Sequence, residues 1–306
     1  MSMNSIQYRN SCSTFRRWWY LIALLSIADL VHATEGGRSI YPHGPENTPL
    51  ALPPPGVYLT NFINYYSANR FNDEHGESKI KDFDLKAVAD IVRITHVTPY
   101  KIFGADFAWQ ALVPFVNVDV KAGGVKQSKA SFGDITLTPF ILGWHAGHLH
   151  WAFASDVTFP TGSYDKNDLA NAGHNFFNIE PIFIASYNDP QGLEVSAKIM
   201  YDINFENDAT KYRSGQEFHV DYYAGWHWGA FSVGVSGYAY QQTSDDQVNG
   251  VRVGVDGNRG RVLAFGPLLR YDIGHTPVIL TWQHETWAQN RPEGDKLWLK
   301  VIIPLP

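Results

Sequence analysis

From residue 56 to the C-terminus, apolar and polar residues alternate in runs long enough to cross a membrane. In the clearest run, residues 192–205, apolar side chains at odd positions alternate with mostly polar ones at even positions. Successive side chains of a strand point to opposite faces, so this run has one apolar and one polar face. It is longer than the about 5–6 residues of a typical soluble strand and suits a tilted transmembrane strand. The strands must then close into a barrel, because lipid cannot satisfy an open sheet edge.

Twelve segments of this kind predict an all-β fold, an antiparallel transmembrane β-barrel of about 12 strands. An even number of strands returns both ends of the barrel to the same side of the membrane. The expected strands cover residues 56–68, 84–97, 103–120, 131–144, 149–160, 175–188, 192–205, 213–226, 229–242, 259–272, 276–289 and 294–304.

The connections between these strands are alternately short and long. Outer-membrane barrels have short periplasmic turns and longer extracellular loops, so this asymmetry predicts the bacterial outer membrane. Tight turns are expected at 98–101, 145–148, 189–191, 227–228 and around Gly274, and longer loops at 69–83, 121–130, 161–174, 206–212 and 243–258.

The first 33 residues have the three parts of a secretory signal peptide. Three arginines precede an apolar run at 18–31, and Ala33 ends a small-residue cleavage site. An uncleaved anchor helix is the alternative, but the run is shorter than the ~20 residues that a membrane span needs. We expect a signal peptide at 1–33, cleaved near Ala33, a Pro/Gly-rich segment at 34–55 and the barrel at 56–306.

Composition limits the remaining chemistry. The only cysteine, Cys12, lies in the expected signal peptide, so the mature chain has no thiol for a disulfide or a lipid anchor. A formal net charge of −6 argues against a nucleic-acid partner. His145, His148 and His150 lie close together, but they lack a cysteine or a suitably spaced carboxylate. We expect no metal site and no cofactor.

The polar faces of the strands should line the lumen. These side chains could form a salt-bridged filling that closes a narrow barrel, or a polar lining beside a binding path. Both interpretations are compatible with segment 34–55 entering the lumen as a plug, because Gly/Pro-rich backbone at membrane depth must be shielded from lipid. The expected ionisable lumen residues are His150, Asp156, Glu180, Glu194, Lys198, Asp202, Glu217, His219, Asp221 and Glu285.

Aromatic residues make up 14% of the chain, more than a soluble core requires, and many lie near the expected strand ends. Aromatic girdles at both membrane interfaces are typical of outer-membrane barrels. The residues expected in these girdles are Tyr65, Tyr66, Trp144, Trp151, Trp226, Trp228, Tyr238, Tyr240, Trp282 and Trp287.

A barrel-embedded lipid hydrolase is the enzymatic alternative. Such an enzyme needs a histidine, a serine nucleophile and an orienting acidic or amide group. His284 and Glu285 lie on opposite faces of one expected strand, and the sequence has no Gly-x-Ser-x-Gly motif. We expect a non-enzymatic protein with no catalytic residue, although a site built across neighbouring strands stays open.

Several short motifs recur along the mature chain at expected turns, bulges and strand ends. They are Thr34-Glu35-Gly36-Gly37, Tyr41-Pro42-His43-Gly44, Pro54-Pro55-Gly56-Val57-Tyr58, Phe132-Gly133-Asp134-Ile135, Thr138-Pro139, Gly143-Trp144, Phe159-Pro160-Thr161-Gly162-Ser163-Tyr164, 175–181, Gly266-Pro267 and Tyr271. With these motifs the chain resembles an outer-membrane transporter family, the one named for the MetA-pathway of phenol degradation. The resemblance implies a channel or transporter for aromatic and other hydrophobic compounds, without a cofactor. The C-terminal sequence Ile303-Pro304-Leu305-Pro306 departs from the terminal aromatic residue that barrel assembly machinery commonly reads.

These observations together predict an outer-membrane channel for small hydrophobic, aromatic compounds. Its expected partners are those solutes, outer-membrane lipid or lipopolysaccharide, and the assembly machinery. The alternative is a structural or surface-binding barrel whose long loops carry the function. The residues expected to bind solute or line its path are Tyr41, Tyr58, Phe62, Phe176, Glu180, Glu194, Lys198, Glu217, His219, Asp221 and Tyr223.

Overall fold

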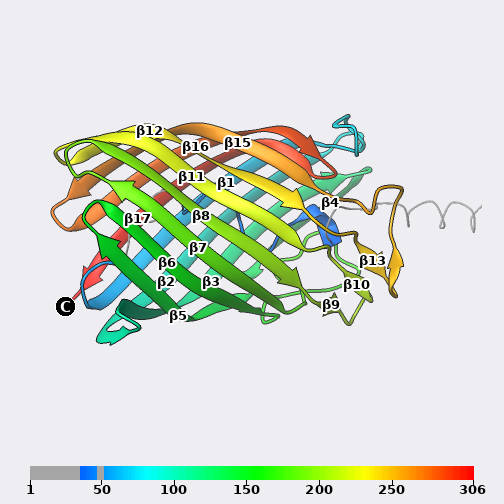
Figure 1. Ribbon diagram of the computed structural model, residues 1–306. Helices are drawn as coiled ribbons and strands as arrows, with labels where there is room; N and C mark the ends of the chain where they lie inside the picture. Colours follow the sequence, from blue (N-terminus) through cyan, green and yellow to red (C-terminus); the bar gives the residue numbers. More distant parts are fainter. Residues whose placement is uncertain (1–34, 47–51) are drawn as a thin grey trace, which may run out of the picture. The chain divides into compact units, whose positions relative to one another are not determined.

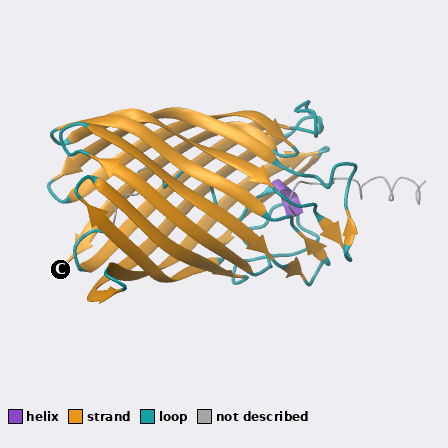
Figure 2. Ribbon diagram, in the orientation of Figure 1, coloured by secondary structure: helices purple, strands orange, loops and turns teal. Residues whose placement is uncertain are grey.

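The computed structural model describes residues 35–46 and 52–306, which form a barrel of antiparallel strands (Figure 1). The predicted signal peptide at 1–33 lies outside the described residues, and so do residues 34 and 47–51. Strands and short connections account for nearly all of the barrel, with a single turn of 3-10 helix, η1 (Glu35–Gly37), before it (Figure 2). Within the described residues, no helix is long and apolar enough to span a membrane.

Each barrel strand pairs with its sequence neighbours, and β1 pairs with β17 to close the ring. Strands β4 and β5 pair with successive halves of β3 and together take one place, so the closed barrel has the predicted twelve positions. The strands are β1 (Gly56–Phe71), β2 (Asp84–Ile102), β3 (Ala105–Ala122), β4 (Val125–Phe132), β5 (Ile135–Ala146), β6 (Leu149–Phe159), β7 (Asn178–Asn188), β8 (Leu193–Asn204), β11 (Glu217–Trp228), β12 (Phe231–Gln242), β15 (Arg261–Ile273), β16 (Thr276–Gln289) and β17 (Pro292–Leu305).

Two predicted connections in the first third of the barrel are wrong. The turn expected at 98–101 is part of β2, where the register shifts between Val97 and Lys101 and a bulge accommodates Pro99. Proline fits a bulge because it has no N–H to donate to the ladder. The loop expected at 121–130 is a hairpin that turns at Gly123 and Gly124, both with positive φ. Strand β4 alternates weakly in polarity, so the sequence pattern did not reveal it.

The two ends of the barrel differ as predicted. At the end near the C-terminus the strands are joined by short turns. At the opposite end, longer connections form a small separate sheet (Figure 1). By the length rule for outer-membrane barrels, the long-loop end is extracellular. The small sheet consists of β9 (Glu206–Asn207), β10 (Tyr212–Arg213), β13 (Gln247–Val248) and β14 (Val251–Arg252).

The two faces of the wall have opposite polarity. Outward side chains such as Leu193, Val195 and Leu280 are apolar and more than 40% exposed, as a lipid-facing band requires. Nine of the ten expected lumen residues are buried, and His150 lies half-buried at the short-turn rim. Among the expected girdle aromatics, Tyr66, Tyr238 and Tyr240 were wrongly assigned. They point inward and contact lumen groups, because their positions have the inward parity of their strands.

Candidate functional site

Asp221 on β11 holds the N-terminal segment, residues 35–46, against one side of the lumen. Its buried carboxylate accepts hydrogen bonds from the Tyr41 hydroxyl at 2.9 Å and from the backbone N–H groups of Gly44 at 2.8 Å and Glu46 at 3.1 Å. The Nζ of Lys198 lies 4.8 Å from the centre of the Tyr41 ring. Hydrogen bonds to a buried charge are among the stronger polar contacts in a protein. The segment is therefore fixed to the wall at its middle.

Lysines on β17 hold the same segment from another part of the wall. The Lys296 Nζ donates to the carbonyl of Pro42 at 2.8 Å, and the Lys300 Nζ donates to the carbonyl of Pro45 at 3.0 Å. At the extracellular end, the Glu35 carboxylate accepts hydrogen bonds from Tyr164 at 2.9 Å and Asn207 at 2.6 Å. Residues 35–46 thus connect the loops to several strands through the lumen.

Glu46 ends the described part of the segment in an ion pair that spans the lumen. Its carboxylate pairs with Arg93 on β2 and lies 3.6 Å from the Nζ of Lys300. Burial alone would raise the pKa of Glu46, but the positive charges of Arg93, Lys300 and Lys198 outweigh it and hold the pKa at about 2. Glu46 is therefore ionised at neutral pH.

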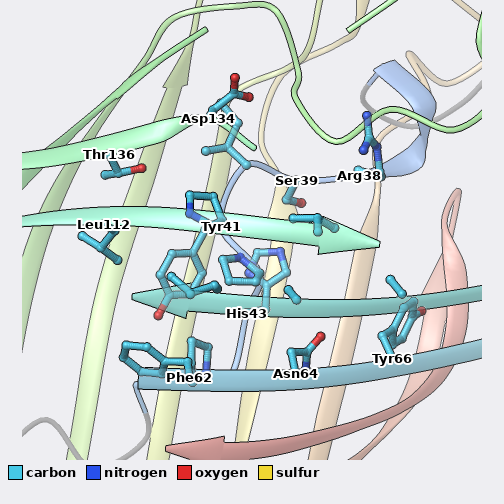
Figure 3. A pocket seen from close by; sticks show the side chains of 18 of the residues that line it. Arg38, Ser39, Tyr41, His43, Phe62, Asn64, Tyr66, Leu112, Asp134 and Thr136 are labelled. Atoms are coloured by element: carbon cyan, nitrogen blue, oxygen red, sulfur yellow. The ribbon is translucent and has the colours of Figure 1, made fainter. Parts of the chain in front are cut away.

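Between this segment and the β1–β3 part of the wall lies a cavity of about 270 Å³ (Figure 3). Tyr41 and His43 project toward it from the segment, and Phe62 and Leu112 from the wall. An apolar cavity of ~150 Å³ is large enough to bind benzene. A single-ring aromatic molecule therefore fits this space.

The side of the cavity formed by β1, β2 and β3 is mostly apolar, and its polar residues are Asn64, Arg93 and Gln110. In β2 and β3, positions that face the lumen alternate with positions that face lipid. Toward the extracellular end of both strands, the lumen-facing residues are aliphatic residues, alanine or proline. Alanines at 87 and 89 leave room that larger side chains would fill. The apolar lining is Phe62, Leu85, Ala87, Ala89, Ile91, Leu112, Pro114, Val116 and Val118.

Packed clusters lie above and below this apolar wall. Toward the extracellular end, loop residues Ile80, Phe83 and Ala170 form a buried cluster with inward residues of β1 and β3. Toward the short turns, the Glu46–Arg93 pair is followed by a cluster that includes Met200, against which Tyr58 packs. The cavity is therefore a pocket within the barrel, bordered by a packed cluster toward each end.

The opposite side of the lumen is polar and tightly bonded. The His219 Nε2 lies 2.8 Å from an Asp202 oxygen and 3.4 Å from a Glu180 oxygen. Near the short turns, the His227 Nε2 lies 2.6 Å from Glu194. One half of the lumen is thus an ionic filling, and the other half borders a pocket.

The sequence model of a known protein family matches residues 68–301, most of the described barrel. The family is described as the MetA-pathway of phenol degradation. The chain belongs to this family. Its own motifs, quoted above, supply many of the contacts between the N-terminal segment, the loops and the wall.

Solved structures of other outer-membrane proteins share the barrel. An outer-membrane channel from Pseudomonas putida F1 superimposes with a TM-score of 0.75 and 16% sequence identity, covering 84% of this chain and 98% of that one. The beta domain of the Bordetella autotransporter BrkA gives a TM-score of 0.50 at 8% identity, covering 82% and 99%. No curated protein matches the chain. The fold and the family establish a bacterial outer-membrane barrel.

One family motif explains how the extracellular loops are fixed. Asp134, between β4 and β5, accepts hydrogen bonds from the backbone of Gly162 at 2.9 Å and of His174 at 2.7 Å. A Cβ on Gly162 would lie 2.7 Å from backbone atoms of Gly133 and Gly173, so only glycine fits this junction. Burial would raise the pKa of Asp134, but the hydrogen bonds from His174 and Gly162 lower it.

The predicted site residues fall into three groups in this family member. Tyr41, Phe62, Glu180 and Lys198 line the pocket. His219 and Asp221 lie under the N-terminal segment and contact Tyr41. The remaining five lie elsewhere in the lumen, packed or bonded within the wall and loops: Tyr58, Phe176, Glu194, Glu217 and Tyr223.

The apolar wall was missed by the sequence reasoning. In β2, the inward residues Leu85, Ala87 and Ala89 alternate with Lys86, Val88 and Asp90, which face outward. The charged residues Lys86 and Asp90 therefore lie on the outward face of this strand. The useful signal was the run of small apolar residues at every second position, followed by Arg93.

His284 and Glu285 lie on opposite faces of β16, as expected. His284 is exposed and its Nδ1 lies 2.9 Å from an Asp295 oxygen. Glu285 is buried and accepts hydrogen bonds from Tyr66 at 2.7 Å and from the Gly294 backbone at 2.9 Å. The two side chains that suggested a hydrolase therefore contact different partners on different sides of the wall.

Proposed function

We propose that this protein carries small hydrophobic compounds, with single-ring aromatics as the main class, across the outer membrane. The observation that carries the proposal is the pocket of about 270 Å³ with one apolar wall made by β1, β2 and β3. The family's association with phenol degradation agrees with this solute class.

The pocket provides a lower barrier to such solutes than the lipopolysaccharide leaflet. Its aliphatic wall removes apolar surface from water, at roughly 25 cal/mol per Å². Its aromatic and polar groups on the segment side orient a ring without enclosing it completely. Conduction needs binding that is favourable enough for uptake and weak enough for release, and a pocket with one polar side meets both needs.

The N-terminal segment narrows the lumen in this proposal. Its polar contacts with Asp221, Lys296 and Lys300 fill the side of the barrel that water-soluble solutes would otherwise use. The channel should therefore exclude sugars while it admits apolar rings.

A tryptophan placed in the pocket tests this route. Ala89→Trp would fill the space between the apolar wall and the segment, whereas Val88→Trp introduces the same side chain next to it on the lipid-facing side. With each variant expressed in cells that lack the wild-type gene, labelled toluene uptake should fall at least tenfold for Ala89→Trp and stay near the wild-type rate for Val88→Trp. Equal rates in the two variants would exclude the pocket as the route.

A surface-binding barrel is the second candidate. The small sheet of β9, β10, β13 and β14 gives the longest loops an ordered structure, which favours a role in contact with an external partner. In that case neither tryptophan would change solute uptake, and deletion of the loop residues 244–257 would remove the function.

A further inference from the structure

Three side chains on adjacent strands converge at one level of the polar half of the lumen. Glu180 is the third residue of β7, His219 is the third residue of β11, and Asp202 lies near the matching end of β8. All three are buried, and one ligand atom from each lies within 4.8 Å of the others. The His219 Nε2 faces an oxygen of each carboxylate, at 2.8 and 3.4 Å.

These separations match a metal coordination shell. Zinc binds imidazole nitrogen and carboxylate oxygen at about 2.0–2.2 Å, so neighbouring ligands of a tetrahedral site lie about 3.3 Å apart. The cluster brings two carboxylates to one imidazole, and the carboxylate of Glu217 lies beside Asp202 with an Oε2 that has no hydrogen-bond partner. Lys198 and Arg291 balance part of this negative charge, and a divalent cation would balance the rest.

His43 supplies an independent indication. It belongs to the N-terminal segment, is 1% exposed, and neither ring nitrogen has a hydrogen-bond partner. Its ring lies edge-on to that of His219, with 4.8 Å between centroids. Buried polar groups are rarely left without partners, and a bound ion or water is a usual explanation.

We propose that Glu180, Asp202 and His219 form a binding site for a divalent transition-metal ion, with Zn²⁺ as the preferred probe, and that His43 moves toward the ion to become its fourth ligand. Two imidazoles and two carboxylates are a donor set that such ions accept. Glu180 and His43 also line the pocket, which provides a path for the ion. Because His43 comes from the N-terminal segment and the other three ligands from the wall, the ion fastens the segment to the barrel.

The test is zinc binding by the purified full-length mature protein in detergent. The Nδ1 atoms of His145 and His150 lie 3.0 Å apart at the exposed short turns. This pair would bind zinc whether or not the proposed site in the lumen does. Both are therefore replaced by asparagine in every sample. After treatment with EDTA and its removal, the protein is incubated overnight with ZnCl₂, dialysed, and assayed for bound metal.

The expected result is about one zinc per chain, with an affinity at least tenfold weaker in His43→Gln and Asp202→Asn. His227→Gln is the matched control, because His227 is also a buried inward histidine of β11 paired with a carboxylate, Glu194. That variant should bind zinc like its parent. If the Asp202→Asn variant does not fold, the zinc affinity of His43→Gln alone tests the proposal, because that substitution removes no hydrogen bond from the wall. No zinc in the parent, or equal zinc in His43→Gln and His227→Gln, would overturn the proposal.

Discussion

Removing the Asp221 carboxylate should free the N-terminal segment without unfolding the barrel. Asp221→Ala deletes three hydrogen bonds to one buried charge, from Tyr41, Gly44 and Glu46. At about 1.5 kcal/mol each, the lower value for bonds to a charged group, the loss is about 4.5 kcal/mol. Since each 1.4 kcal/mol is a factor of ten, the detached population should rise roughly a thousandfold.

The rate at which a buried thiol reacts measures this population. His43→Cys places a reporter at a position that is 1% exposed and makes no side-chain hydrogen bond. When opening and closing are fast, modification follows the population of the open form. Maleimide labelling of His43→Cys should therefore be about 10²–10³ times faster when combined with Asp221→Ala, from the bond energies above.

Glu194→Gln is the control for loss of a buried charge. Glu194 is 0% exposed, but its partner is His227 in the wall. The Glu194→Gln substitution should therefore leave the labelling rate of His43→Cys unchanged. Heat-modifiable migration in electrophoresis verifies that each barrel is folded. A folded Asp221→Ala barrel that labels less than tenfold faster would refute the assignment of Asp221 as the main attachment of the segment.

Three further predictions follow from particular groups. The pKa of Glu46 is lowered from an ordinary 4.5 to about 2, so the stabilisation that the Glu46 carboxylate gives the segment is present above pH 4.5 and is lost as the pH falls toward 2. Over that range, an acid-tolerant disulfide reagent should label His43→Cys faster as the pH falls. In the double variant that also carries Glu46→Gln, the labelling rate should not change with pH. Gly162→Val should lower the yield of folded barrel severalfold, because its Cβ would lie 2.7 Å from two backbone atoms, whereas Ser163→Ala should not; equal yields would contradict the close approach. Mass spectrometry of the exported protein should give Thr34 as its first residue, and a retained Met1 would contradict signal cleavage.

The barrel could be predicted because membrane strands follow a simple physical rule. One face of each strand must be apolar, so the alternation in residues 192–205 or 276–289 locates the strand and both its faces. The rule weakens where strands leave the lipid, which explains the missed β4 and the hairpin at Gly123 and Gly124.

The pocket was harder to predict than the barrel, because it depends on how the N-terminal segment crosses the lumen. The sequence showed that 34–55 could not form a helix or central strand, but not that Asp221 would bind Gly44 and leave the β1–β3 side open. Likewise, the approach of His43 to His219 joins residues far apart in the chain. Contacts of this kind have no periodic pattern in the sequence.

The most direct test of the central claim is uptake of trace labelled toluene and arabinose by cells in which the gene is deleted and then restored. The account predicts that deletion slows toluene uptake, that the restored gene returns it to the original rate, and that arabinose uptake is the same in all three strains. If toluene enters all three strains at the same rate, transport of small hydrophobic compounds is contradicted.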